Sequence, residues 1–272
     1  MLMRPLSGLL HVRGLVSGQR IARAVVSMPI FLALVAVFAL SAVASATASA
    51  AEPEFGRCKN EAGTFKDSNC TVGGGTAFKW VPLAEGEKVK FTSTSGEGFL
   101  ETANGEKVTC TADTNVGETN GPKKDVVTVT FTGCTSSGFK CNSAGAAAGE
   151  IKTNKLLSEI GYINKAAKEV GLRLKPEGEL FVEFECVGGI VKVKTKGAVI
   201  GKYTPVNEMN EKFVLNLKCV AGKKGVQEIE KFEGGLKETL ASSKNGGAFE
   251  AACNNSGEDK ITFTGNKLEV KA

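Results

Sequence analysis

The sequence predicts an all-β protein, either an antiparallel β-sandwich or a closed β-barrel with disulfides, with little or no helix outside an N-terminal signal segment. From Phe78 onward, apolar and polar residues alternate with a period of two, and glycine-centred turns interrupt the alternation. About fifteen short strands separated by such turns favour a sandwich or a barrel. All eight cysteines lie after residue 50, and their even number is typical of a disulfide framework.

The first 50 residues have the layout of a leader. Residues 1–23 hold four arginines and no acidic residue, and the apolar run Ala24–Ala44 follows directly. Ala48-Ser49-Ala50 fits the A-x-A pattern of a signal-peptide cleavage site, which would make Ala51 the new N-terminus. An apolar run of 21 residues is also long enough to span a bilayer, so an uncleaved anchor is the alternative. Both alternatives place the rest of the chain outside the cytoplasm, either secreted or at the cell envelope.

Residues 51–77 differ in composition from the segment that follows. They hold Cys58 and Cys70 among Gly, Asn, Ser and Lys, with few apolar residues. We therefore expect a disulfide-pinned N-terminal appendage over 51–77 and a single antiparallel β-domain over 78–272.

Two strands of that domain are especially clear. From Phe213 to Cys219, every second residue is apolar or cysteine, which is typical of a half-buried strand. From Asp125 to Cys134, valines and a phenylalanine alternate with threonines in the same way. The best helical window, 164–169, is no longer than a loop or a single turn.

Three hairpins have turns that set a register. A two-residue turn at Gly188-Gly189 would give one apolar face and one face of paired charges. Its register would pair Cys186 with Val191, Glu185 with Lys192, Phe184 with Val193, and Glu183 with Lys194. A turn at Gly265-Asn266 would pair Phe263 with Leu268 and Ile261 with Val270. A turn at Asn104-Gly105 would pair Phe99 with Cys110 and Glu101 with Val108.

The eight cysteines are expected to form four disulfides, because the leader sends them to an oxidising compartment. Closeness in sequence and shared strand faces predict four pairs: Cys58 with Cys70, Cys134 with Cys141, Cys110 with Cys186, and Cys219 with Cys253. A zinc site is the rival interpretation. It is disfavoured because there is no C-x-x-C motif and because His11, the only histidine, lies in the leader.

Charge and motifs exclude several classes of function. Of the 34 basic residues, four arginines lie in the leader, and none of the 29 acidic residues does, so the rest of the chain carries about +1. A near-neutral protein lacks the field that draws a protein onto nucleic acid, so no nucleic-acid partner is expected. Without a histidine, the exported part cannot form Ser-His-Asp or Cys-His catalytic pairs. No phosphate-binding loop, dinucleotide fingerprint, nucleophile elbow or calcium loop is present, so we predict no catalytic residue, cofactor or metal.

Three features could be interpreted as functional. Glu183 and Glu185 lie on one strand face roughly 7 Å apart, as a pair of glycosidase carboxylates might be placed. The hairpin register sets each opposite a lysine, which favours an exposed charge ladder instead. The stripe of Lys192, Lys194 and Lys196 is expected to belong to the same ladder. Trp80 is expected to be a core residue more than a platform for sugar stacking.

Several short motifs resemble those of a group of secreted, cysteine-containing, β-rich bacterial proteins of unassigned function. The motifs are Glu54-Phe55-Gly56-Arg57-Cys58, Cys70-Thr71, Phe131-Thr132-Gly133-Cys134, Gly149-Glu150-Ile151 and Val199-Ile200-Gly201. The resemblance covers residues 54–235 and leaves out the segment from Leu236 that contains Cys253. It implies export and a β fold stapled by cysteines, and it supplies no catalytic residue.

These observations favour a secreted or envelope-associated non-enzymatic protein with a structural or binding role. A carboxylate-dependent hydrolase of extracellular polysaccharide is one alternative, and a small barrel that binds an apolar ligand is the other. A filled core would favour the structural or binding protein. Two unpaired carboxylates in a deep pocket would favour the hydrolase, and an apolar lumen would favour the ligand-binding barrel. The sequence does not identify a partner, although a component of the cell envelope is a candidate. It predicts membrane contact only through an uncleaved leader.

Overall fold

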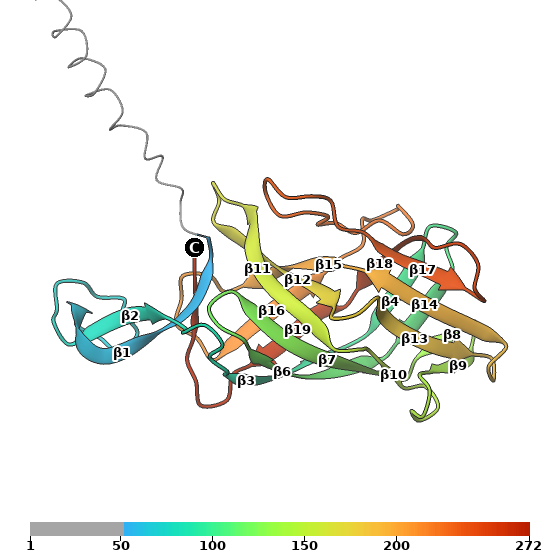
Figure 1. Cartoon of the computed structure of the whole chain (residues 1–272), viewed down its shortest axis with the longest axis horizontal. Helices are drawn as coiled ribbons and strands as arrows, with labels where there is room; N and C mark the ends of the chain where they lie inside the picture. The colour runs from blue at the N-terminus through green and yellow to red at the C-terminus, as the bar shows by residue number, and fades with distance from the viewer. Residues whose placement is uncertain (1–51) are drawn as a thin grey trace, which may run out of the picture. The chain divides into compact units, whose positions relative to one another are not determined.

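The computed structural model describes residues 52–272, and all regular secondary structure in that range is β-strand, as the sequence predicts. The strands form two closed antiparallel barrels and one three-stranded sheet (Figure 1). No helix within residues 52–272 has the length and hydrophobicity that a membrane span requires. The predicted leader, with its cleavage residues Ala48, Ala50 and Ala51, lies outside the described residues.

Barrel 1 has the strand order β7-β11-β12-β15-β16-β19-β3-β6 and is closed by the pairing of β6 with β7. The short strand β10 (Ile151–Lys152) extends the sheet beside β7. The barrel strands are β3 (Lys90–Ser95), β6 (Ala112–Thr119), β7 (Lys124–Thr132), β11 (Leu156–Asn164), β12 (Glu169–Pro176), β15 (Val199–Thr204), β16 (Lys212–Leu217) and β19 (Gly257–Thr262).

Barrel 2 has the order β13-β14-β17-β18-β4-β5-β8-β9 and is closed by the pairing of β9 with β13. Its strands are β4 (Gly98–Thr102), β5 (Lys107–Cys110), β8 (Thr135–Ser136), β9 (Phe139–Asn142), β13 (Leu180–Cys186), β14 (Val191–Gly197), β17 (Leu240–Lys244) and β18 (Glu250–Asn255).

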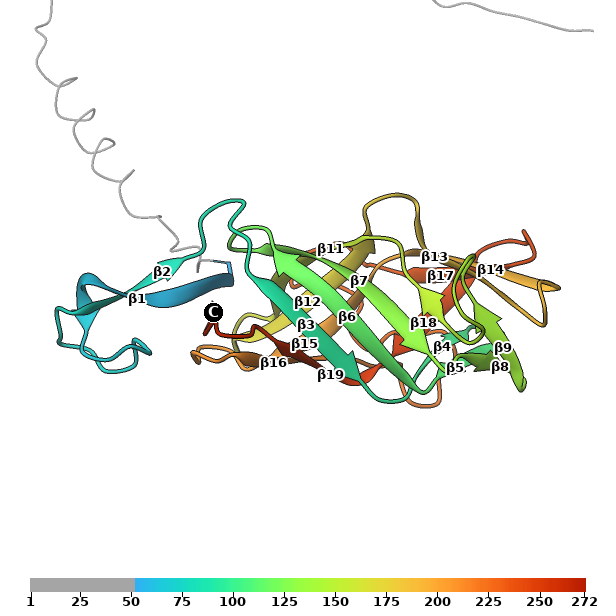
Figure 2. The same ribbon diagram turned by 90° about the horizontal axis from the view of Figure 1, so that it is seen from below.

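The two barrels are joined end to end, and the chain passes from one to the other at eight places (Figures 1 and 2). Six of these passages take only one to three residues, for example Ala198 between β14 and β15 or Ser256 between β18 and β19, whereas those from β9 to β10 and from β16 to β17 are longer. Glycines with positive φ at these passages, such as Gly197 (φ 96°) and Gly133 (φ 63°), allow the strand to turn from one sheet into the next. The barrels are therefore interleaved in sequence and share one junction.

The N-terminal segment forms a sheet with the C-terminus in the order β2-β1-β20, with β1 (Glu54–Phe65), β2 (Phe78–Pro82) and β20 (Glu269–Lys271). Phe55, at the start of β1, is fully buried and contacts the rings of Tyr203 and Phe263 in barrel 1. The rest of β1 and its partner β2 project from barrel 1 as a hairpin (Figure 1). The Cys58–Cys70 disulfide closes the loop of this hairpin.

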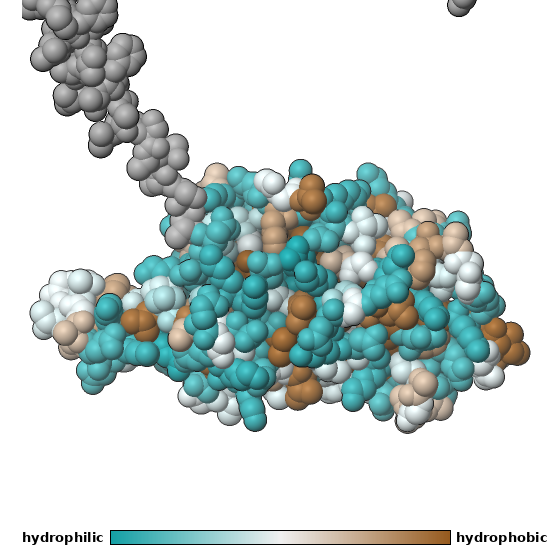
Figure 3. All heavy atoms as spheres, in the orientation of Figure 1, coloured by the Kyte–Doolittle hydropathy of each residue, from teal (hydrophilic) through white to brown (hydrophobic). Residues whose placement is uncertain are grey.

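The polar and apolar residues separate between surface and interior. The face drawn in Figure 3 is mostly hydrophilic, with apolar residues scattered among polar ones. The apolar side chains form the cores inside the barrels. Examples are Leu156, Phe213 and Leu215 in barrel 1, and Phe184 and Val193 in barrel 2. This separation is what the period-two alternation predicts.

The predicted register of the central hairpin is confirmed. β13 and β14 pair Glu183 with Lys194, Phe184 with Val193, Glu185 with Lys192 and Cys186 with Val191. The hairpin of β4 and β5 also forms, but its predicted register is wrong by one residue, since Phe99 lies opposite Thr109 and Glu101 opposite Lys107. The reason is a three-residue loop from Ala103 to Gly105, with Gly105 at φ 82°, where the prediction had a two-residue turn.

The predicted C-terminal hairpin is wrong. Both edges of β19 are occupied, one by β16 and the other by β3, so no edge remains for the strand that follows. After the turn at Gly265-Asn266 the chain leaves barrel 1 and β20 pairs with β1, setting Val270 opposite Phe55. Closure of the barrel therefore decides the partner of the last strand.

Two of the four predicted disulfides are formed, Cys58–Cys70 and Cys219–Cys253. The other two predicted pairs, Cys134 with Cys141 and Cys110 with Cys186, are wrong. The structure instead has Cys110–Cys134 and Cys141–Cys186. Cys141 lies directly opposite Cys186 where β9 pairs with β13 to close barrel 2, with Cα atoms 4.1 Å apart. Proximity in sequence misled the prediction because barrel closure brings the more distant cysteine nearer.

Candidate binding cavity

A cavity of about 90 Å³ lies at the junction of the two barrels. This is roughly three times the ~30 Å³ that a water molecule occupies in the liquid. Most of its wall is apolar and comes from both barrels: Leu100, Val108 and Phe184 from barrel 2, and Val129, Leu174 and Leu217 from barrel 1. Such an apolar cavity with a few polar groups is the usual form of a small-molecule site.

A polar cluster forms one part of the wall, at the end of barrel 1 that faces barrel 2. It consists of Ser93 on β3, Asp113 and Asn115 on β6, and Asp259 on β19, three neighbouring strands whose alternation turns these side chains inward. Asp113 and Asn115 are only 4% exposed and Asp259 is 8% exposed. Asp113, Asn115 and Asp259 line the junction cavity itself.

Asn115 holds the cluster together. Its Nδ2 lies 3.0 Å from Asp113 Oδ1, 3.2 Å from both carboxylate oxygens of Asp259 and 2.6 Å from Ser93 Oγ. The Ser93 hydroxyl donates to Asp259 Oδ2 at 3.2 Å, and the Ser95 hydroxyl donates to Asp113. No lysine, arginine or histidine lines the cavity, so these hydrogen bonds are the support that the structure gives the two carboxyl groups.

Burial favours the protonated form of both carboxyl groups. Removal from water, together with the nearby charge of Asp113, raises the pKa of Asp259 to about 7, although the hydrogen bonds from Ser93 and Asn115 lower it. Burial also raises the pKa of Asp113, while the hydrogen bonds from Ser95 and Asn115 lower it. Carboxyl groups with raised pKa values in a cavity are typical of functional sites.

Three other polar atoms in the cavity wall have no hydrogen-bond partner: Asn115 Oδ1, Thr195 Oγ1 and Ser256 Oγ. Thr195 is 1% exposed and Ser256 is 6% exposed. An unpartnered polar atom in such a place costs about 1 to 3 kcal/mol. Three of them around one cavity indicate that something other than protein completes the site.

Another buried carboxyl group, Asp125 on β7, does not line the junction cavity but lines a smaller cavity inside barrel 1 together with Ser93, Asn115 and Asp259. It accepts a hydrogen bond from Ser158 on the neighbouring strand β11. Burial raises its pKa to about 7, and its charge contributes to the raised pKa of the buried Tyr203. Asp125 therefore has a pKa raised by burial, as Asp259 does, although it does not line the junction cavity.

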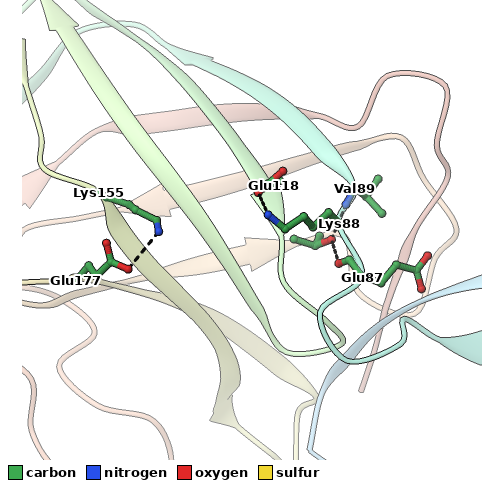
Figure 4. A network of polar contacts seen from close by, with 7 residues as sticks. Glu87, Lys88, Val89, Glu118, Lys155 and Glu177 are labelled. Carbon is green, nitrogen blue, oxygen red and sulfur yellow. Dashed lines mark hydrogen bonds and ion pairs between the residues drawn. The ribbon is translucent and has the colours of Figure 1, made fainter.

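The surface carboxylates contrast with this arrangement. On barrel 1, Glu118 lies 2.5 Å from Lys88, and Glu177 lies 3.1 Å from Lys155 (Figure 4). The hydrogen bond from Lys88 holds the pKa of Glu118 below its usual value. These carboxylates are neutralised by lysines, whereas those of the cavity have no basic side chain beside them.

An open hollow of about 620 Å³ lies at the far end of barrel 2. Leu100 and Val108 line both this hollow and the junction cavity, so these two side chains stand between them.

None of the residues that the sequence analysis considered as catalytic or binding groups lines the junction cavity, whereas Cys110, one of the predicted disulfide cysteines, does. Glu183 lies on the outer face of barrel 2, 3.4 Å from Lys194, as an exposed ion pair. Lys196 lies over the ring of Phe249 at 4.2 Å. Trp80 is half-buried in the N-terminal hairpin, with the Lys271 ammonium 4.5 Å from its ring centroid. These residues belong to surface packing.

The sequence analysis missed the cluster because each of its members has a polar or charged residue beside it in the sequence. Asp259 stands between Glu258 and Lys260, which resembles an exposed charged run. One signal was available: Asp259 lies two residues before Ile261, on the apolar face of the strand.

Comparison with known proteins adds no further assignment, since no family model, curated protein or solved structure matches this chain. Within residues 52–272, no group of three or more His, Cys, Asp or Glu side chains could hold a metal ion. The fold and the cavity define the class of this protein as a disulfide-bonded double β-barrel. Four disulfides are typical of an oxidising, extracytoplasmic environment.

Proposed function

We propose that this protein is a secreted or envelope-associated, non-enzymatic binding protein that holds a small molecule in the junction cavity. The observation that carries the proposal is the mostly apolar cavity with three buried, unpartnered polar atoms in its wall. Bound water could satisfy polar atoms, but a mostly apolar wall offers water few partners and favours a ligand with an apolar part.

Secretion or retention at the envelope is supported by the leader pattern of the first 50 residues and by the resemblance to secreted bacterial proteins. Four disulfides would also persist only in an oxidising compartment.

Hydrolysis of a polysaccharide is the less favoured function. Asp113 and Asp259 are two neighbouring carboxyl groups without a basic partner, as that alternative requires. They are, however, buried in the wall of a cavity of about 90 Å³, which has no room for a sugar ring in a polymer. A glycosidase needs a cleft that admits the glycosidic bond and a water molecule together. The geometry supports binding instead.

The proposal is tested with three compounds of similar size that differ in their polar head: n-butylamine, n-butanol and butanoate. We expect at least one of them to bind the oxidised protein from Ala51 onward, as measured by calorimetry, and to raise its unfolding temperature. A ligand at ten times its Kd would add about 1.4 kcal/mol to the free energy of unfolding.

Val199→Leu is the matching variant, because Val199 lines the cavity and the added methylene would occupy part of it. We expect it to weaken binding at least fivefold. Val127→Leu is the control, since Val127 is a buried barrel 1 residue that does not line the cavity. Absence of binding by all three compounds, or equal binding by both variants, would overturn the proposed function.

A further inference from the structure

The polar cluster of the cavity has more hydrogen-bond acceptors than donors. The Asn115 amide nitrogen lies within hydrogen-bond distance of four oxygen atoms, but an amide nitrogen carries only two hydrogens. The other donors are the single hydroxyl hydrogens of Ser93 and Ser95. Asn115 Oδ1, a further acceptor, has no partner. The cluster is therefore short of hydrogens, and a ligand that fits it would donate them.

The charges of the cluster also favour a ligand that donates hydrogens. Asp113 and Asp259 share Asn115 and have no basic side chain among the residues that line the cavity. A buried carboxylate without a cation costs several kcal/mol, which either a proton or a positively charged ligand can offset. Without a ligand, a proton on the carboxyl group offsets this cost, and a cationic ligand would take the place of that proton.

The rest of the wall limits the polarity and the size of the remaining part of the ligand. Beyond the cluster the cavity is lined by leucine, valine and phenylalanine side chains, which would pack against a hydrocarbon. A volume of about 90 Å³ admits a short chain and excludes a large ring system.

We propose that the ligand of the junction cavity is a small aliphatic primary amine, whose ammonium group binds Asp113, Asp259 and Asn115 Oδ1 and whose apolar chain lies against the barrel interiors. This inference rests on the proposed function and specifies the ligand class. An ammonium group carries three donors and no acceptor, which matches the excess of acceptors. Ser256 Oγ and Thr195 Oγ1, both buried and unpartnered, can each accept a further hydrogen bond and each also carry one hydroxyl hydrogen in the same wall.

The test compares the affinities of n-butylamine, n-butanol and butanoate for the oxidised protein at pH 7.5 by calorimetry. We expect n-butylamine to bind at least tenfold more tightly than n-butanol, and butanoate to bind most weakly. Asp259→Asn should remove the advantage of the amine over n-butanol. Asp125→Asn is the matched control, because Asp125 is an equally buried carboxyl group of barrel 1 that does not line the cavity.

The wild-type protein provides a second readout that does not depend on a variant folding. Around Asp259 the titratable groups are Asp113 on β6, Asp125 on β7 and Tyr203 on β15. Lowering the pH from 8 to 5 protonates Asp259, whose pKa is about 7, so amine affinity should fall at least tenfold while n-butanol affinity stays constant.

The outcomes separate the inference from the proposed function. If n-butanol binds and n-butylamine binds no more tightly, the amine inference is wrong and the binding function stands. The inference is also wrong if n-butylamine binds equally to the wild type and Asp259→Asn, since the amine then lies elsewhere. If none of the three compounds binds, the binding function itself fails.

Discussion

Asp125 and Asp259 are the residues whose chemistry departs most from that of an exposed side chain. Both are buried inside barrel 1, and burial raises the pKa of each from 3.8 to about 7. None of residues 52–272 is a histidine, since His11 is the only histidine of the chain. Between pH 5 and 8, the titration of the folded protein is therefore dominated by these two carboxyl groups.

This predicts that the free energy of unfolding falls as the pH rises from 5 to 8. In that range the folded state holds protons on Asp125 and Asp259 that the unfolded state has already lost, so raising the pH favours unfolding. Each group should contribute a loss of about 2 to 3 kcal/mol between pH 5 and 8. Urea unfolding at both pH values measures the change.

Asp125→Asn should remove roughly half of the pH dependence, because the amide has the same shape and does not titrate. Glu183→Gln is the control, since Glu183 is an exposed carboxylate paired with Lys194. A wild-type stability that is constant or rises from pH 5 to 8 would show that these aspartates are ionised in the folded state.

At the level of the strand, the passages between the barrels are the features that set the architecture. β14 ends at Gly197, and β15 begins at Val199 in the other barrel. Gly197 has φ 96°, and a Cβ atom there would lie 1.9 Å from the carbonyl oxygen of Thr239. Only glycine fits this passage, since both the backbone conformation and the space exclude a side chain.

Gly197→Ala is therefore expected to destabilise the protein by at least about 2 kcal/mol, from strain and from displacement of the neighbouring strand. Gly178→Ala is the control. Gly178 lies in another passage, between β12 and β13, where a Cβ atom would meet no other atom within 4 Å. We expect Gly178→Ala to change the stability by less than about 0.5 kcal/mol. Equal unfolding temperatures for the two variants would mean that the passage at Gly197 tolerates a side chain.

For the whole molecule, the disulfides divide between the barrels and the projecting hairpin. Cys110–Cys134 and Cys141–Cys186 lie in barrel 2, where all four cysteines are buried. Cys58–Cys70 lies in the N-terminal hairpin, outside both barrels.

Peptide mapping of the unreduced protein should therefore recover Cys110 linked to Cys134 and Cys141 linked to Cys186. Replacing Cys141 and Cys186 together by alanine should cost about 2 to 4 kcal/mol, because this bond ties β9 to β13 where barrel 2 closes. The matched change at Cys58 and Cys70 should leave the unfolding temperature of the barrels nearly unchanged, because it frees only the hairpin loop. Peptides that link Cys134 to Cys141 would contradict the structure.

The sequence by itself determined the secondary structure, the number of disulfides and the register of the β13–β14 hairpin. Alternation and turn residues act between neighbouring residues, and at Gly188-Gly189 they agree with one another. The same local rules missed the register of β4 and β5 by one residue, because they cannot choose between a two-residue and a three-residue loop.

Only the tertiary structure decided that the strands close into two interleaved barrels, which cysteines pair inside barrel 2, and that β20 joins β1. It also brought Asp113 and Asp259, which are far apart in the chain, to one buried asparagine at the junction. These outcomes depend on contacts between distant segments, and on the rule that each strand edge accepts one partner. Such contacts leave no periodic signal within a single strand. The cavity could therefore be recognised only from the closed barrels of the tertiary structure.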